Sequence, residues 1–77
     1  MTKQLKFNLH YLRTKAGFTK KEMANKLNAS RHQYDNWENH NTIKPKSNQL
    51  SQICRFYGIS IDSILLTDLS ILEGELV

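Results

Sequence analysis

The chain has little cysteine, proline or glycine: its 77 residues include one cysteine, one proline and three glycines. The lone Cys54 cannot form a disulfide within the chain, which indicates a reducing compartment. No apolar run approaches the ~20 residues that a membrane-spanning helix needs, and no signal-peptide pattern opens the sequence. We therefore expect one small cytoplasmic domain with no membrane partner.

Positive charge is absent from the C-terminal end. Residues 56–77 hold no Lys or Arg and four acids, a balance of −4, whereas residues 1–55 hold all 11 Lys and Arg against three acids, a balance of +8. A basic body attracts polyanions and gives salt-dependent binding. An acidic and apolar end would be repelled by DNA, so we expect it to face elsewhere. Ordinary solvated charge is the alternative explanation.

The sequence also has little that points to catalysis or to a bound metal. The three histidines, His10, His32 and His40, lack metal-ligand spacing, and no cysteine cluster accompanies them. No nucleophile–base pair and no phosphate-cradling glycine loop is recognisable. We expect no enzymatic activity, no metal and no cofactor.

Two capping boxes organise the middle of the chain. Thr19 is followed three residues on by Glu22, and Ser30 is followed three residues on by Gln33. In each pair the hydroxyl can accept the backbone N–H at the third helical position, while the longer side chain reaches back to the cap. The boxes predict helices over about 20–27 and 30–38, joined by a turn at Asn28-Ala29.

Apolar residues at helical spacing predict three further helices. A loop over 39–46 is expected around Pro45, and Gly17 and Gly58 are expected to end helices. The sequence thus predicts an all-α domain of five short helices, with no convincing strand. The expected inward residues are Leu5, Leu9, Leu12 and Ala16 in helix 3–16; Leu50, Ile53, Cys54 and Tyr57 in a helix capped by Ser47; and Ile61, Ile64 and Leu65 in a helix capped by Ser60.

The segment 18–38 has the layout of a helix-turn-helix, in which the second helix turns Tyr34 and Trp37 inward and polar side chains outward. Over about residues 5–66 the sequence resembles the lambda-repressor-like, or Cro/cI-type, helix-turn-helix proteins. The resemblance is carried by Leu12-Arg13, Gly17, the block Thr19 to Leu27 with Ala24, Ser30, Tyr34, Trp37-Glu38, Pro45 and FYGISIDSIL over 56–65. Departures from the family pattern are Lys20 in place of glutamine, and Asn28 and His40 in place of glycines.

The resemblance implies a compact five-helix fold that binds operator DNA as a dimer, with the second helix of the motif reading bases in the major groove. It implies a sequence-specific transcriptional regulator, most simply a repressor of phage, mobile-element, restriction-control or antitoxin type. It also implies a structural salt bridge between Arg13 and Glu38. The implied base contacts are Arg31, His32, Gln33 and Asn36, and the implied phosphate contacts are Lys20, Ser30, Asn39, Asn41, Lys44 and Lys46.

The side chains of the second helix suit these roles unequally. Arg31 can pair bidentately with guanine, worth ~1–3 kcal/mol of discrimination, and its alternative role is a phosphate contact. Gln33 can pair with adenine, but it is also the capping partner of Ser30, so the two roles compete. Asp35 would be repelled by phosphate, and we expect it at the edge of the interface or accepting a hydrogen bond from a neighbour.

The C-terminal end carries a leucine stripe at 4-3-4 spacing. We divide the chain into a helix-turn-helix domain over 1–66 and an apolar extension over 67–77. A small domain has little core left to cover this stripe, and an exposed apolar patch usually marks a partner. A homodimer contact is therefore expected, and folding of the extension back onto its own chain is the alternative. The stripe consists of Leu65, Leu69, Leu72 and Leu76.

Two other functions compete with DNA reading. A protein-interaction module on the same fold is favoured by Asp35, His40 and the acidic end. Binding of RNA or of single strands would need exposed aromatic side chains for stacking, and most aromatics here fall on apolar stripes.

Overall fold

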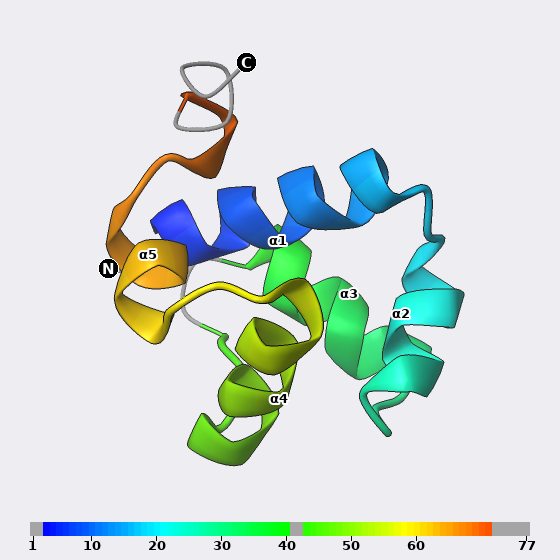
Figure 1. The fold of residues 1–77 in the computed structure, drawn as a ribbon. Helices are drawn as coiled ribbons and strands as arrows, with labels where there is room; N and C mark the ends of the chain where they lie inside the picture. Colours follow the sequence, from blue (N-terminus) through cyan, green and yellow to red (C-terminus); the bar gives the residue numbers. More distant parts are fainter. Residues whose placement is uncertain (1–2, 41–42, 72–77) are drawn as a thin grey trace.

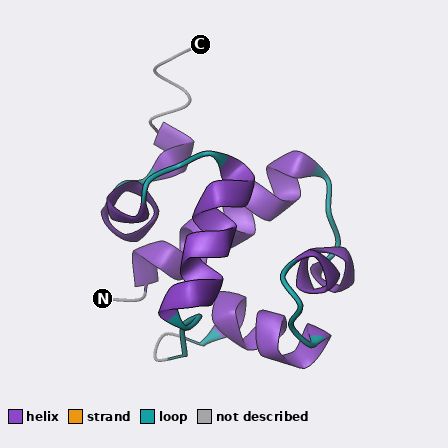
Figure 2. Cartoon of the chain, turned by 60° about the horizontal axis from the view of Figure 1, so that its bottom comes forward, coloured by secondary structure: helices purple, strands orange, loops and turns teal. Residues whose placement is uncertain are grey.

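The computed structural model describes residues 3–40 and 43–71 and builds them almost wholly from helices (Figures 1 and 2). Helix α1 packs against α3 and α5, α2 packs against α3, and α4 packs against α5. No strand occurs in the described ranges, so the all-α prediction is confirmed. The helices are α1 (Lys3–Ala16), α2 (Lys20–Lys26), α3 (Arg31–Asn39), α4 (Ser47–Tyr57) and α5 (Ile61–Leu66).

One hydrophobic core joins all five helices. It buries the expected stripes of α1, α2 and α4, together with Tyr34 and Trp37 of α3 and Ile64 of α5. Two expected core residues are exposed instead: Ala16 lies in the last turn of α1, just before the chain leaves it, and Ile61 lies in the first turn of α5. Helical periodicity alone does not reveal whether a terminal turn is covered by a neighbouring helix.

The helix termini follow the capping chemistry of the sequence, with one correction. Thr19 and Glu22 form the full capping box, and Ser30 and Ser60 each accept the backbone N–H three residues on. Helix α4 differs, because its cap is Lys46 and not Ser47. The Lys46 N–H donates to the Gln49 side-chain oxygen over 3.0 Å, so the cap is supplied from within the helix.

The turn of the helix-turn-helix uses a left-handed residue, as expected. Asn28 has a φ of 55°, and it follows the last turn of α2. The next amide, of Ala29, donates to the Ala24 carbonyl over 2.9 Å, which closes the end of the helix. This turn sets the angle at which α3 leaves α2.

Asn8 ties the end of α5 and the segment after it to α1. Its buried amide nitrogen donates to the carbonyls of Ile64 and Thr67, both over 2.8 Å. Its oxygen accepts the Leu69 N–H over 3.3 Å. A helical turn begins at Leu69, so the chain directly after α5 is folded onto the domain.

Burial of Leu69 corrects the expected dimer stripe. Leu69 is 3% exposed and belongs to the core of its own chain, and Leu65 is half-buried against that core. A side chain with no free surface cannot be a contact for a second subunit, so this part of the stripe follows the fold-back alternative. Leu72 and Leu76 lie outside the described residues.

Candidate nucleic-acid interface

Helix α3 has one face fixed in the core and one face directed outward. Tyr34 and Trp37 are buried and touch edge to face, with ring centroids 5.7 Å apart. On the other side of the helix Arg31 and His32 are exposed, and Gln33 and Asn36 are half-exposed. The four residues expected to read bases therefore remain accessible, on a helix whose inner edge cannot rotate.

Helix α3 is also anchored to α1 by an ion pair. Glu38, whose side chain is 1% exposed, accepts from Nε of Arg13 over 2.7 Å and from its Nη2 over 3.2 Å. The same guanidinium donates to the Phe18 carbonyl over 2.8 Å, at the start of the link to α2. Nδ1 of His10 lies 3.2 Å from Oε1 of Glu38, the same oxygen that accepts from Nη2 of Arg13. One network thus connects α1, α3 and the start of the motif.

The pKa values of this network follow from burial and pairing. Burial acts to raise the pKa of Glu38, but the hydrogen bonds from Arg13, together with the nearby Tyr34 hydroxyl and His10 ring, outweigh it, and the pKa lies below its usual value. The hydrogen bond to Glu38 raises the pKa of Arg13. Burial, reinforced by Glu38, raises the pKa of Tyr34, whose hydroxyl lies near the carboxylate without a well-formed hydrogen bond among the described residues. Glu38 therefore stays ionised at neutral pH.

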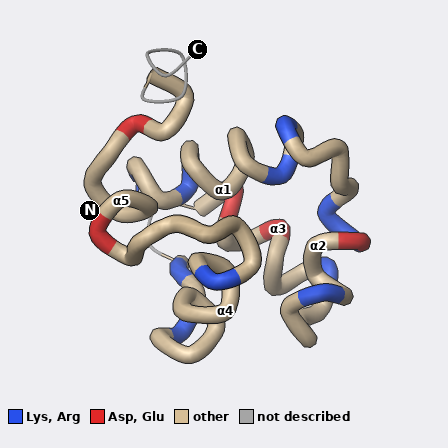
Figure 3. Tube along the Cα trace, in the orientation of Figure 1, with Lys and Arg blue, Asp and Glu red and all other residues tan. Residues whose placement is uncertain are grey.

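The N-termini of α2 and α3 open onto adjoining hollows. Arg31 lines both of them, with His32 and Asp35 in one and with Lys20 and Lys21 in the other. The structure therefore brings one expected phosphate contact, Lys20, beside the expected base readers Arg31 and His32. Figure 3 shows lysine and arginine positions at this end of α2 with an acidic position directly beside them, and further acidic positions in α5 and in the segment after it.

Asp35 occupies the edge of this basic surface. One of its oxygens, Oδ1, accepts from Nζ of Lys20 over 2.5 Å and from Nδ2 of Asn39 over 2.8 Å. The hydrogen bond from Lys20 is the largest cause that lowers the pKa of Asp35. The expectation that Asp35 accepts a hydrogen bond from a neighbour is confirmed, and it has two such neighbours.

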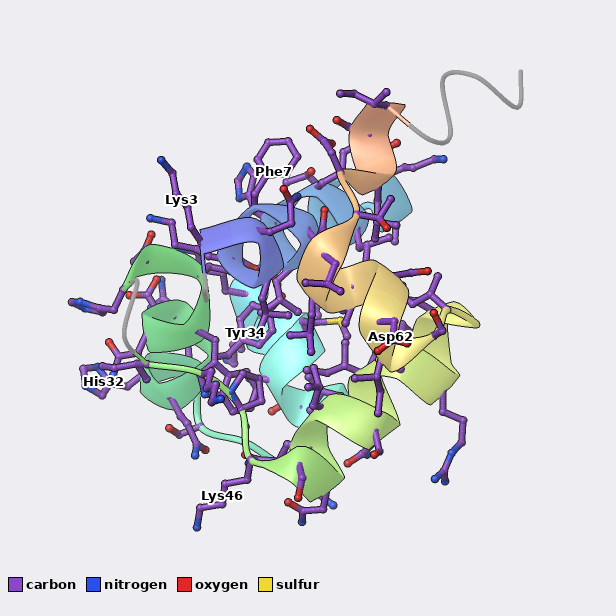
Figure 4. All side chains as sticks on the ribbon, turned by 90° about the vertical axis from the view of Figure 1, so that its left-hand side faces the viewer. Lys3, Phe7, His32, Tyr34, Lys46 and Asp62 are labelled. Carbon is purple, nitrogen blue, oxygen red and sulfur yellow. The ribbon has the colours of Figure 1, made fainter. Side chains whose placement is uncertain are left out.

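The loop before α4 carries the remaining expected phosphate contacts. Lys44 and Lys46 are exposed on either side of Pro45, which is buried and so fixes the loop between them. Neither lysine lines the two hollows at the motif, so they form a separate basic position. Figure 4 shows His32 and Lys46 on one side of the molecule and Asp62 on the other. Asn41 lies outside the described residues.

Of the two capping residues of α3, Ser30 acts as expected and Gln33 does not. Oγ of Ser30 accepts the Gln33 N–H over 3.0 Å, and its own hydroxyl proton stays available for a phosphate oxygen. In the described residues the Gln33 side chain makes no bond back to the cap, so only half of the box forms. Capping therefore does not occupy the Gln33 side-chain amide, and its contact with a base remains a prediction.

Two participants, Asn8 and His10, escaped the sequence reasoning, as did the second bond of Asp35. Asn8 and His10 are polar residues in a helix, and nothing in their spacing separates them from surface residues. The double engagement of Asp35 could have been anticipated in part, because Asn39 lies four residues after it on the same helix face. Within the described ranges no group of three His, Cys, Asp or Glu could hold a metal ion, and no helix is long and apolar enough to cross a membrane.

The tight turn, the buried inner edge of α3 and its polar outer edge define a helix-turn-helix domain of the DNA-binding class. Comparison with known families agrees: a family model described as a helix-turn-helix domain matches residues 8–69, and the chain belongs to that family. The matched region runs from Asn8 to Leu69, the two residues that join α1 to the segment after α5. No curated protein and no solved structure matches the chain.

Proposed function

We propose that the protein is a sequence-specific regulator of transcription that inserts α3 into the major groove of double-stranded DNA. The observation that carries this proposal is the two-sided character of α3. Its inner residues are buried or ion-paired, while Arg31, His32 and Asn36 stay accessible. A groove-reading helix needs this combination, because base contacts discriminate only when the helix has a fixed position.

The proposed contacts divide into base readers and phosphate holders. Arg31, His32, Gln33 and Asn36 are assigned to base edges. The phosphate holders are assigned to three places: the start of α2, both ends of α3, and the loop before α4. They are Lys20, Ser30, Asn39, Asn41, Lys44 and Lys46. The sequence resemblance to the lambda-repressor-like proteins supports this assignment, and a repressor of phage, mobile-element, restriction-control or antitoxin type is the specific role we propose.

Selection of bound sites from random duplex DNA tests the proposal directly. Against the selected site, Arg31→Ala is expected to relax the preference at one base pair, at a cost of ~1–3 kcal/mol. Lys44→Ala is expected to weaken binding to all duplexes and to flatten the salt slope by about one unit. Arg55→Ala removes an exposed arginine near the end of α4 and serves as the charge-matched control. If neither test variant differs from this control, the regulator assignment is wrong.

We also propose that the protein acts as a homodimer on a two-fold symmetric site. Leu69 is no longer available, but Leu66 is 78% exposed, and Phe7 and Ile71 are exposed as well. Phe7 shares a surface hollow with Asp68, which places it beside the segment that carries Ile71. A two-fold dimer would set the recognition helices ~34 Å apart. Sedimentation across a concentration range tests this, and a monomer at high micromolar concentration would exclude it.

A protein-interaction module is the second candidate, and the engagement of Lys20 by Asp35 favours it, because that lysine is not held ready for DNA. The two functions separate in one measurement. An interaction module would show no selected sequence and no duplex binding in the micromolar range at 50 mM salt.

A further inference from the structure

The carboxylate of Asp35 already holds two donors that are assigned to phosphate. Its Oδ1 accepts from Lys20 over 2.5 Å and from Asn39 over 2.8 Å. Lys20 lies at the start of α2 and Asn39 at the end of α3, so a single oxygen spans both helices of the motif. The side chains of Lys20 and Asp35 are 28% and 40% exposed, so the pair sits where a DNA backbone could reach it.

We propose that Asp35 is an internal competitor for the DNA backbone, which occupies Lys20 and Asn39 and so weakens sequence-independent binding. The inference rests on the proposed function of α3. A carboxylate oxygen and a phosphate oxygen are chemically equivalent acceptors for an ammonium and an amide group. Lys20 has three N–H donors, but Asp35 already neutralises its charge, so a phosphate gains the full attraction of Lys20 only when that ion pair opens.

The position of the acid makes this competition effective. The other residues that line the two hollows at the motif are cationic or neutral: Arg13, Thr19, Lys20, Lys21, Arg31 and His32. Asp35 is therefore the one acid among the described residues that line these two hollows. Once Lys20 and Asn39 bind the DNA backbone, the unpaired carboxylate of Asp35 faces the negatively charged phosphates. The repulsion between two like charges near 4 Å in water is equivalent to about a fivefold change in affinity.

The consequence is a lower affinity for DNA of any sequence. Phosphate contacts position a protein but carry no sequence information, and a chromosome offers a large excess of competing sites. A protein that binds every duplex less tightly spends less time on those competing sites, while its ratio of operator to non-operator affinity is unchanged. Asp35 would thus set how much of the protein is held by non-operator DNA.

Asp35→Asn tests the inference in the full chain, with anisotropy of a labelled random-sequence duplex of 25 base pairs as the readout. Loss of the exposed Lys20–Asp35 ion pair by itself should change the affinity for DNA by about 1.5- to 5-fold. Together with the lost repulsion, we expect about tenfold tighter binding at 50 mM salt. The slope of log affinity against log salt should become steeper by about 0.9, because one further phosphate is neutralised.

The matched control is Asp62→Asn. It makes the same change in net charge at an exposed residue of α5, on the far side from His32 and Lys46 (Figure 4). It should change the affinity less than twofold. Asp35→Ala, which removes the acceptor as well as the charge, should reproduce the gain of Asp35→Asn. Circular dichroism establishes that each variant is folded.

A double variant identifies the released partner. If Lys20 supplies the new phosphate contact, then Lys20→Met combined with Asp35→Asn should return the salt slope to that of the wild type. If the double variant keeps the steeper slope, Lys20 is not held back by Asp35 and the inference is wrong.

Two results on single variants would also overturn the inference. An Asp35→Asn affinity equal to that of Asp62→Asn would mean that only net charge matters. Weaker binding of Asp35→Asn to the selected operator, with random DNA unchanged, would mean that Asp35 accepts a hydrogen bond from a base. Failure of the proposed function looks different, because the wild type and every variant would then leave duplex DNA unbound, and the inference would fall with it.

Discussion

Replacing Glu38 by glutamine should cost the domain a large part of its stability. The substitution keeps the shape of the side chain but removes the charge that faces Arg13 over 2.7 Å and His10 over 3.2 Å. The Glu38 side chain is 1% exposed and that of Arg13 is 11% exposed, so water cannot replace the lost partner. Breaking a buried pair on one side costs ~3–5 kcal/mol, and we expect about 3 kcal/mol because glutamine retains one acceptor oxygen.

That loss is large for a domain of this size. Stabilities of roughly 0.1 kcal/mol per residue give about 8 kcal/mol for the wild type. With a urea slope of about 1 kcal/mol per molar, the unfolding midpoint of Glu38→Gln should fall by roughly 3 M. The fluorescence of Trp37, the one tryptophan of the chain, reports the transition beside the mutated residue, and far-ultraviolet circular dichroism reports it over all the helices.

Two comparisons make the measurement specific. Glu22→Gln should stay close to the wild type, because glutamine also serves in a capping box. The double variant Arg13→Met, Glu38→Leu should lose less stability than the sum of the losses in the two single variants. The reason is that neither charge is left unpaired in the double variant. A shift below about 0.5 M for Glu38→Gln, with both probes coincident, would refute the view that this pair anchors α3.

The lowered pKa of Glu38 determines how the stability of the domain changes with pH. The pKa of Glu38 is lowered in the folded protein from an ordinary value of 4.5, so its contribution is present above pH 4.5 and is lost as the pH falls through the folded value. The stability difference between the wild type and Glu38→Gln should therefore be constant near neutral pH and shrink below about pH 4.5. A difference that grows on acidification would contradict the assignment.

Three further predictions concern the rest of the scaffold. Asn8→Ala leaves two carbonyls and the Leu69 N–H without their partner and should lower the free energy of unfolding by ~2–4 kcal/mol. Asn8→Asp should also be destabilising, because a carboxylate cannot donate to the two carbonyls. Urea unfolding measures both losses. Gly58→Ala meets no atom within 4 Å, so its cost is that of a φ of +69° alone, ~1–2 kcal/mol, and calorimetry should record a Tm lower by roughly 4–16 °C. Lys26→Ala removes an ammonium 4.9 Å from the Phe18 ring and 5.6 Å from the Phe56 ring and should cost ~0.5–1 kcal/mol, measured against Lys21→Ala.

The sequence was most informative where local chemistry decides the structure. The Thr19 box, the Ser30 cap and the left-handed Asn28 each depend on residues within four positions, and each forms as expected. The start of α4 was misassigned because serine is the commoner cap, whereas here the Gln49 side chain satisfies the Lys46 amide. Both candidates lie one residue apart, so the error does not affect the fold.

Interactions across long sequence separations were harder to predict. The periodicity of Leu65 and Leu69 indicates an apolar face but does not specify what covers it, and the deciding bonds come from Asn8, about sixty residues earlier. Asn8 itself has no local signature, because a buried asparagine and an exposed one look alike in a helix. The Arg13–Glu38 pair was expected only through the family resemblance, not from spacing.

The spacing of the buried residues on α3 explains how a helix of nine residues can be held in the core and still present side chains to DNA bases. Tyr34, Trp37 and Glu38 fall at i, i+3 and i+4 and share the buried edge, so the remaining positions of the helix must face away from the core. Packing and ion pairing at the buried edge of α3 therefore determine the position of the exposed edge without any direct contact to it. A substitution such as Glu38→Gln should then lower the discrimination between operator and random DNA even though Glu38 contacts no base, whereas Asp35→Asn should change the affinity for all DNA. Opposite outcomes for these two neighbours would show that the division between the two edges of α3 is wrong.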